Sequence, residues 1–460
     1  MTSPPDALLA AAATIGARLC REAIWGGARC AWVGPDERVR PDGGTTVVQT
    51  ASEPGLHSGT AGIALFLAEL HVLTGEPLFR TTALGAAAHA ESRLEAVRPD
   101  ARLSLHEGWP GIALALDRVA TALGEPGVGT RARAALASLD PPDGTPLDLM
   151  GGAAGAIPAL LDLADEPLVA LAVREGERLL ATAEPAAAWS GAAIGEGEAS
   201  LAAVAWSGAA IGEGEAPSVA VAWSGAAIGE GEASPPALGC SWATIGAGEP
   251  HLCGASHGAS GIGVALLELA ARTRDRRFLD AGRGAFAFES ARFDAAAGGC
   301  PDLRPWTHGE DGRPAFPATW CHGSAGAALT RLRAAALDPA PHLLDEARAA
   351  LATCRAAASD DPSDRDASLC HGAAGLGEAL LAGGEALGDG ALRDAALALG
   401  LRHAEALTRG EIPRSGLRTA APASGLMLGE AGLGHHLLRL GAPGRVAGVL
   451  HLQPGSTARR

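Results

Sequence analysis

The sequence contains no tyrosine, lysine or asparagine, and aromatic residues make up only 3% of its 460 residues. The three missing residue types use AT-rich codons, whereas the abundant alanine, glycine, arginine and proline use GC-rich codons. The bias therefore indicates a GC-rich genome, and the absence of tyrosine from any one site carries no functional meaning.

Positive charge and long apolar runs are also scarce. A net charge of −16 disfavours nucleic acids and anionic membranes as partners. We find no run of about 18 apolar residues free of charges and helix breakers, so we expect no membrane span. The start at Met1–Asp6 lacks the basic residues of a signal peptide, and we expect a cytoplasmic protein.

The eight cysteines lie far apart in a long chain, which is not the pattern of a disulfide framework. Reduced thiols with a metal-binding subset fit this spacing better. The cysteines are Cys20, Cys30, Cys240, Cys253, Cys300, Cys321, Cys354 and Cys370.

What the sequence has in abundance is one repeated phrase, a Gly-x-x-Gly step followed by an apolar helical run. Most steps are roughly 45 to 65 residues apart, which suits two helices of about 11–12 residues with loops. Seven such units predict an all-α toroid of about seven inner and seven outer helices, with the Gly-rich turns at the starts of the inner helices. The first glycines of the steps are Gly59, Gly108, Gly152, Gly258, Gly323, Gly372 and Gly429.

Secondary-structure signals agree with this architecture. Apolar spacing predicts helices over residues 6–23, 84–96, 264–273 and other segments, whereas alternating strands are few and the best candidate is 45–49. We expect residues 1–460 to form a single domain.

One interval is too long, the 106 residues from Gly152 to Gly258. A 17-residue phrase beginning Trp-Ser-Gly-Ala-Ala recurs there from Trp189, Trp206 and Trp223. We interpret residues 189–239 as a tandem insert that forms a flexible surface loop, produced by replication slippage. The alternative is a lid or partner-docking loop, because the insert precedes His257.

Two steps carry cysteine immediately before the glycine turn, as Cys321-His322-Gly323 and Cys370-His371-Gly372. Equivalent repeat positions face the same centre of a ring. Cys321, Cys370 and His371 therefore predict a zinc site, because two thiolates and one imidazole leave a fourth position open for water or substrate. His322 is a competing ligand, Cys253 and His251 are weaker ones, and a structural role for each residue is the alternative.

His257 occupies the corresponding position of another unit, without a cysteine. Its near-neutral pKa suits a general acid or base beside a metal-activated nucleophile. Asp148 lies close to the same position and is predicted either to orient His257 or to cap a helix.

These phrases together resemble the lanthionine synthetase C-like (LanC) cyclase family, over most of residues 50 to 440. The Trp-Cys-x-Gly and Cys-His-Gly pair is the most specific part. The stretches 293–326 and 254–261 are similar to the cyclase half of class II lanthipeptide synthetases.

The resemblance implies an α/α toroid in which Cys321, Cys370 and His371 bind zinc and His257 and Asp148 are catalytic. It implies that a cysteine of a precursor peptide adds to dehydroalanine or dehydrobutyrine to form a thioether ring. Nothing here resembles a dehydratase half, so we expect a separate dehydratase to supply the dehydrated peptide. Pro317 stands where some members have arginine, and Arg313 is a candidate substitute.

Three alternative functions stay open at this point. The chain could add glutathione or another thiol to dehydrated residues, or it could bind peptides without catalysis. A glycosidase on a similar barrel is disfavoured, because only Asp148 lies near the repeat position where paired carboxylates would be needed.

Overall fold

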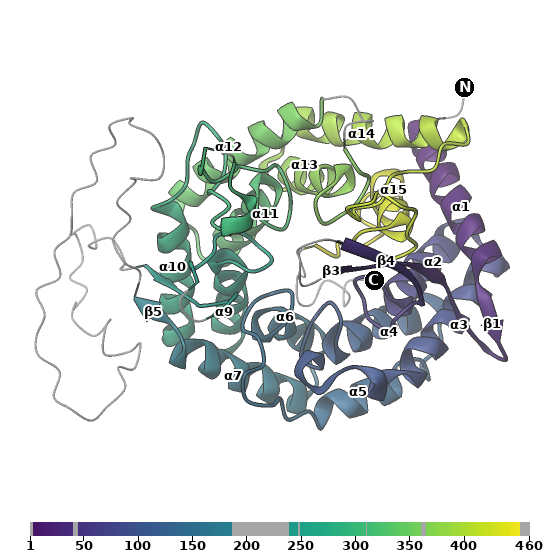
Figure 1. The fold of residues 1–460 in the computed structure, drawn as a ribbon, viewed down its shortest axis with the longest axis horizontal. Coiled ribbons are helices and arrows are strands. Elements are labelled where there is room, and N and C mark those ends of the chain that lie inside the picture. Colours follow the sequence, from purple (N-terminus) through teal and green to yellow (C-terminus); the bar gives the residue numbers. More distant parts are fainter. Residues whose placement is uncertain are drawn as a thin grey trace, which may run out of the picture.

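The computed structural model describes residues 3–39, 45–185, 239–246, 249–309, 311–359 and 365–450. The predicted insert at 189–239 lies outside the described residues except for Gly239, so the expected single-domain organisation of residues 1–460 stays a prediction. The described residues form two concentric rings of helices around a central opening (Figure 1).

The inner ring confirms the repeat analysis, because each of its helices begins directly after the first glycine of one step. These helices are buried on nearly every side and carry apolar residues all round, as expected of helices enclosed by an outer layer. They are α2 (Thr60–Thr74), α4 (Trp109–Leu123), α6 (Ala153–Leu163), α9 (Ala259–Thr273), α11 (Ser324–Leu337), α13 (Ala373–Leu387) and α15 (Glu430–Gly441).

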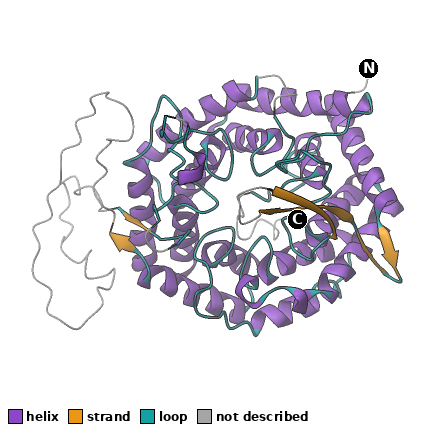
Figure 2. Cartoon of the chain, in the orientation of Figure 1, coloured by secondary structure: helices purple, strands orange, loops and turns teal. Residues whose placement is uncertain are grey.

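The outer helices bury one stripe each and expose the rest, and several begin with proline in the first turn. Together with the inner ring they make fourteen α-helices in the described residues, so the predicted all-α toroid of seven inner and seven outer helices is confirmed (Figure 2). They are α1 (Pro4–Glu22), α3 (Pro77–Ser92), α5 (Thr130–Ala137), α7 (Glu166–Ala181), α10 (Arg276–Ser290), α12 (Pro341–Ala357) and α14 (Gly390–Thr408).

The glycine steps are needed because the backbone folds tightly on itself where each inner helix begins. A Cβ atom at Gly326 would overlap the carbonyl oxygen of Trp320, and one at Gly375 would overlap that of Leu369. Any larger residue at these positions would displace the preceding turn. The residues in that turn would then move with it.

Hydrogen bonds join the seven turns into a closed circle. In each turn a donor binds the carbonyl oxygen of the residue that lies two positions before the first glycine of the next step. The bonds are His57 N to His106 O, Ser104 Oγ to Met150 O, Met150 N to Ser256 O, Ser256 N to Cys321 O, Cys321 N to Cys370 O, Cys370 N to Met427 O and Met427 N to His57 O, at 2.7–3.3 Å. The residues at this repeat position are therefore held at one end of the toroid, side by side.

Three short two-stranded hairpins accompany the helical rings in the described residues. The predicted strand at 45–49 is confirmed as part of β4 (Thr45–Ala51), which pairs antiparallel with β3 (Val33–Val39). In the view of Figure 1 this hairpin extends over the ring. The other hairpins are β1 (Ile24–Gly26) with β2 (Arg29–Ala31) and β5 (Glu184–Pro185) with β6 (Cys240–Ser241).

The helix predicted over 84–96 differs from the structure at both ends. Helix α3 starts earlier, at Pro77, because Glu76 caps its first turn through the backbone N–H of Leu78. It ends at Ser92, and the tighter 3₁₀ turns η1 (Leu94–Ala96) and η2 (Pro99–Ala101) follow; η3 (Pro305–Thr307) lies in the loop before α11.

The ring closes where the first helix meets the last. Helix α1 packs on α15 and α14, and Arg18 of α1 forms a 2.7 Å ion pair with Glu430 of α15. Among the described residues, no helix combines the length and the apolar character that crossing a membrane requires.

Candidate metal centre and catalytic pair

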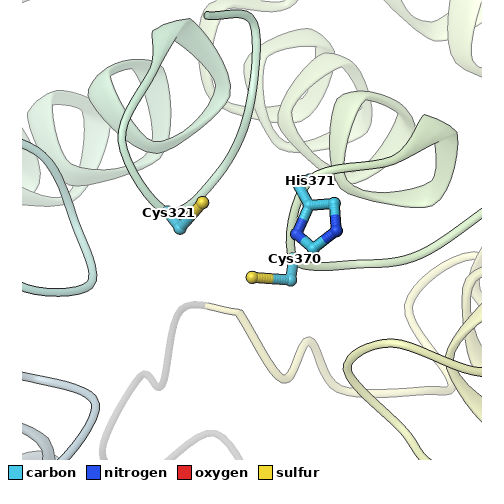
Figure 3. A group of neighbouring side chains, drawn as sticks. All are labelled: Cys321, Cys370 and His371. Carbon is cyan, nitrogen blue, oxygen red and sulfur yellow. The ribbon is translucent and has the colours of Figure 1, made fainter. Parts of the chain in front are cut away.

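The three predicted metal ligands meet at one end of the toroid. Cys321 comes from the turn before α11, and Cys370 and His371 come from the turn before α13, which the backbone bond from Cys321 to Cys370 holds alongside. Their candidate ligand atoms all lie within 4.8 Å of one another, and Figure 3 shows the two sulfur atoms and the imidazole facing a common point.

The two thiols lie within hydrogen-bonding distance of each other. Cys370 hydrogen bonds to Cys321, and this bond lowers the pKa of Cys321 well below its ordinary value and raises that of Cys370 well above it. The neighbouring His371, His322 and Thr319 side chains lower the pKa of Cys321 further. The cluster therefore holds one thiolate readily, and a cation is required before the second can form at neutral pH.

The imidazole of His371 is oriented by a backbone carbonyl. Its Nε2 atom donates to the carbonyl oxygen of Gly416 at 2.7 Å, which leaves the Nδ1 lone pair for a ligand. Burial alone would lower the pKa of His371, but the hydrogen bond to Cys321 and the charge of Asp366 raise it.

The loop that carries Gly416 is fastened from two sides. Gly416 N donates to Leu428 O at 2.8 Å, within the last turn of the circle. Glu37 of β3 accepts hydrogen bonds from the backbone N–H groups of Arg418 and Thr419 at 3.0 and 2.8 Å, and from Thr419 Oγ1 at 2.8 Å. The β3–β4 hairpin thus holds the loop whose carbonyl orients His371.

This donor set fits zinc. Tetrahedral zinc takes sulfur at about 2.3 Å and nitrogen at about 2.0–2.1 Å, which requires ligand atoms roughly 3.5–4 Å apart. The spacing of Cys321, Cys370 and His371 is compatible with that geometry, and the Gly416 contact supplies the second hydrogen bond that metal-binding histidines usually make.

His257 and Asp148 form a hydrogen-bonded pair at the same end of the toroid. His257 Nδ1 lies 2.7 Å from Asp148 Oδ2; the aspartate side chain is only 5% exposed, whereas the imidazole is 35% exposed. Asp148 Oδ1 also accepts from Gly151 N at 2.6 Å. One Asp148 oxygen therefore binds the turn before α6 and the other lies against His257, but Asp148 is not the helix cap, because the N-cap of α6 is Gly152 and no side chain caps it.

The competing ligands lie elsewhere. His322 stacks on His257 with ring centroids 5.6 Å apart and places Nε2 3.2 Å from Ser256 Oγ; burial lowers its pKa to about 4. Cys253 is buried beside Cys300, and His251 contacts Ser241. Within the described ranges, none of the three belongs to a group with metal-ligand spacing.

Sequence reasoning missed three residues near the centre. Arg304 forms a bidentate pair with Asp302 and is close enough to Cys321 and Cys370 for their charges to raise its pKa. Arg313, the candidate substitute, is instead exposed and paired with Asp311. His57 and His106 also lie here, and their position two residues before a step glycine was the available signal.

Two rings of helices, with a sulfur-rich metal-binding cluster and a histidine–aspartate pair at one end, define a class of toroidal protein with a candidate catalytic centre. A family model described as "Lanthionine synthetase C-like protein" matches residues 50–195 and 241–450. The chain therefore belongs to the lanthionine synthetase C-like family, as the resemblance predicted. The break in the match falls on the repetitive segment.

Other comparisons bear on the fold. A solved structure of nisin cyclase matches with a TM-score of 0.51 and 18% sequence identity, over 85% of this chain and 89% of that chain. At this identity the likeness supports the shared fold alone. No curated protein sequence matches this chain.

Proposed function

We propose that the protein is a zinc-dependent cyclase that forms lanthionine or methyllanthionine rings in a dehydrated precursor peptide. The observation that carries the proposal is the convergence of Cys321, Cys370 and His371 with the His257–Asp148 pair at one end of the toroid. The family assignment supports the same chemistry.

Zinc, when held by the three ligands, supplies a Lewis acid that lowers the pKa of a peptide thiol. The thiolate sulfur attacks the β-carbon of dehydroalanine or dehydrobutyrine, and the π electrons move toward the carbonyl to give an enolate. One carbon–sulfur bond forms and one π bond is lost. The proton that leaves the thiol is matched by one delivered to the α-carbon, so the reaction needs no oxidant or reductant.

The proton donor to the α-carbon is His257. Its imidazole is the exposed member of the pair, so it can reach a bound peptide, whereas the buried Asp148 cannot. The carboxylate fixes the orientation of the ring through the 2.7 Å contact with Nδ1. Binding both reacting groups of one peptide also favours ring closure, because it removes much of the entropic cost of the encounter.

The test uses the full chain with a synthetic peptide that contains one dehydroalanine and one cysteine. Metal analysis is expected to find about one zinc per chain. Ring closure leaves the peptide mass unchanged but removes the free thiol, so iodoacetamide no longer labels the peptide. Zinc well below one per chain, or closure no faster than without protein, would contradict the proposal.

The same assay separates the alternatives. With glutathione present, a peptide that gains the mass of glutathione in place of closing would identify an intermolecular thiol transferase. A protein that binds both zinc and peptide but leaves the thiol free would be a binding protein. A separate dehydratase remains part of the proposal, and co-purification of such an enzyme with this chain would support it.

A further inference from the structure

We propose that His57 is a further catalytic residue, whose Nε2–H donates a hydrogen bond to the carbonyl oxygen of the dehydrated residue as the enolate forms. This inference rests on the proposed function, because it concerns the same thiol addition. It assigns to the first unit of the ring a part in the chemistry that the third to sixth units otherwise carry.

The first argument is position. His57 stands two residues before Gly59, and Cys321 and Cys370 stand two residues before their own step glycines. Its backbone is held in the circle of turns on both sides, by His106 O at 2.9 Å and Met427 N at 2.8 Å. The repeat therefore directs the His57 side chain to the same end of the toroid as the metal cluster.

The second argument is the set of ring contacts around His57. Its ring meets that of His106 edge to face with centroids 5.7 Å apart, and His106 meets Trp320 in the same way at 5.9 Å. Trp320 directly precedes Cys321. An aromatic array thus connects His57 to the loop that supplies the first candidate metal ligand.

The electrostatic neighbours agree with this placement. His371 and Cys321 are close enough to influence the charge of His57, and His257 is close enough to influence that of His106. The two imidazoles therefore lie within electrostatic range of the metal cluster and of the proposed proton donor.

The third argument is unmet hydrogen-bonding capacity. His106 is only 2% exposed, yet neither of its ring nitrogens has a partner among the residues that the structure describes. A buried polar group left without a partner costs about 1–3 kcal/mol, so native proteins rarely keep one without a use for it. The unpartnered nitrogens of His106, next to His57, are what we expect at a site that receives a polar group from a ligand.

The charge state of His57 suits a donor. Burial lowers its pKa to about 4, so the ring is neutral at pH 7 and carries one N–H group. Its Nδ1 lies 2.7 Å from Ser58 Oγ. With the hydroxyl donating to Nδ1, the proton resides on Nε2, for which no partner is found in the described part of the chain.

A neutral N–H donor fixed beside the developing enolate stabilises the transition state more than the ground state, because the carbonyl oxygen gains charge as the carbon–sulfur bond forms. Removal of one such donor typically lowers kcat by about 10²–10³-fold. His57 thus complements His257, since one group stabilises the oxygen and the other protonates the α-carbon.

The experiment compares His57→Phe, His57→Gln and wild type, with His71→Gln, at a half-buried histidine near the end of α2, as the matched control. His57→Phe is expected to lower kcat about 10²-fold with zinc content and KM unchanged. His57→Gln keeps an amide N–H near the Nε2 position and is expected to recover much of that loss. A kcat within twofold of wild type in His57→Phe would overturn the proposal.

A change in the substrate tests the contact directly and does not depend on how well the phenylalanine variant folds. The carbonyl of the dehydroalanine is replaced by a thioamide, a weaker hydrogen-bond acceptor, and the four rates are compared in a double-mutant cycle with His57→Gln. We expect the oxygen-to-sulfur effect to be several-fold smaller in the variant. Equal effects in both proteins would overturn the proposal.

The two levels of inference fail differently. A wild-type protein that does not close the oxygen peptide refutes the proposed function, and the role of His57 falls with it. A wild-type protein that closes the peptide normally, with equal thioamide effects, refutes only the role of His57. Loss of zinc from both His57 variants would also overturn it, since His57 would then support the metal cluster.

Discussion

Two carboxylate–imidazole pairs in this molecule have nearly the same geometry and different surroundings. His257 Nδ1 lies 2.7 Å from Asp148 Oδ2 at the end of the toroid, and His436 Nδ1 lies 2.6 Å from Glu378 Oε1 between α13 and α15. The imidazole of the first pair is 35% exposed, whereas that of the second is 1% exposed. Glu378 also pairs with Arg439.

The comparison teaches that pair geometry alone does not identify a catalytic group. Burial lowers the pKa of His436 to about 3, so its ring stays neutral and has no route to solvent or substrate. The Glu378 carboxylate balances a buried guanidinium, which is a structural task. Access to the imidazole and the position beside the cysteine cluster distinguish the pair that we propose to act in catalysis.

The largest effect is expected from removing a cysteine of the candidate metal cluster, which lies at the same end of the toroid as the His257–Asp148 pair. Cys321→Ala takes away a ligand and the hydrogen-bond partner of Cys370, so metal content and ring closure are both expected to fall to background. Zinc analysis and the thiol-labelling assay measure this. Cys354→Ala, a buried cysteine in an outer helix, is the matched control and keeps both.

The next effect separates the two imidazoles. His257→Asn removes the proposed proton donor and is expected to lower kcat by about 10²–10⁴-fold, with zinc retained. His436→Asn is expected to leave kcat nearly unchanged in the folded protein and to lower its stability. Wild-type kcat in His257→Asn would show that the exposed pair takes no part in the reaction.

A third experiment compares how much Glu378 and Asp148 each contribute to the free energy of unfolding. Glu378→Gln leaves the Arg439 guanidinium buried without its counter-charge, and loss of a partner from a buried pair typically costs about 3–5 kcal/mol. Urea denaturation measures the free energy of unfolding. Asp148→Asn is expected to lower the free energy of unfolding less than Glu378→Gln does, and to lower kcat more. The reverse ranking would contradict the distinction between the two pairs.

The pH dependence of stability sharpens the contrast further. The pKa is lowered by burial to about 3 in His436 and to about 4 in His403. Below pH 6.5 the unfolded chain binds protons that the folded state does not, so stability is expected to fall from pH 6.5 toward pH 4. The slope is at most about 1.4 kcal/mol per pH unit for each histidine. His436→Gln should flatten the curve from urea titrations, and an unchanged slope would contradict this assignment.

The smallest effect concerns the contact that orients His371 from a distance. Glu37→Ala frees the loop that carries Gly416 and is expected to weaken zinc binding by about 10-fold, in the range known for groups behind metal ligands. Competition with a chromophoric chelator measures the affinity. Glu411→Ala, which removes an exposed carboxylate paired with Arg409, is the control. Equal affinities in the two variants would exclude an orienting role for Glu37.

The ring and its metal-binding cluster could be predicted from the sequence because both depend on the same repeat. Glycine is required wherever a turn crosses the start of an inner helix. The number of glycine steps in the sequence therefore predicts the number of repeat units. Cys321 and Cys370 stand two residues before their step glycines, His371 and His257 stand one residue before theirs, and the circle of turns brings these places together.

Other parts of the site could not be predicted, because they depend on contacts between segments that no repeat relates. The reach of Glu37 to a loop 382 residues further along the chain leaves no local pattern. The choice of Arg304 over Arg313 depends on the path of an irregular loop. The pairing of His106 with Trp320 is a packing contact between different units.

The seam between α1 and α15 has a consequence for how the chain is made. The outer helix that completes the last unit, α1, is made before every other helix of the ring, and its partner Glu430 follows 412 residues later. Pairing across such a separation is slow, because the intervening chain must be ordered first. Because α1 packs mainly on α15 and α14, most of its apolar stripe stays uncovered until those two helices have been made.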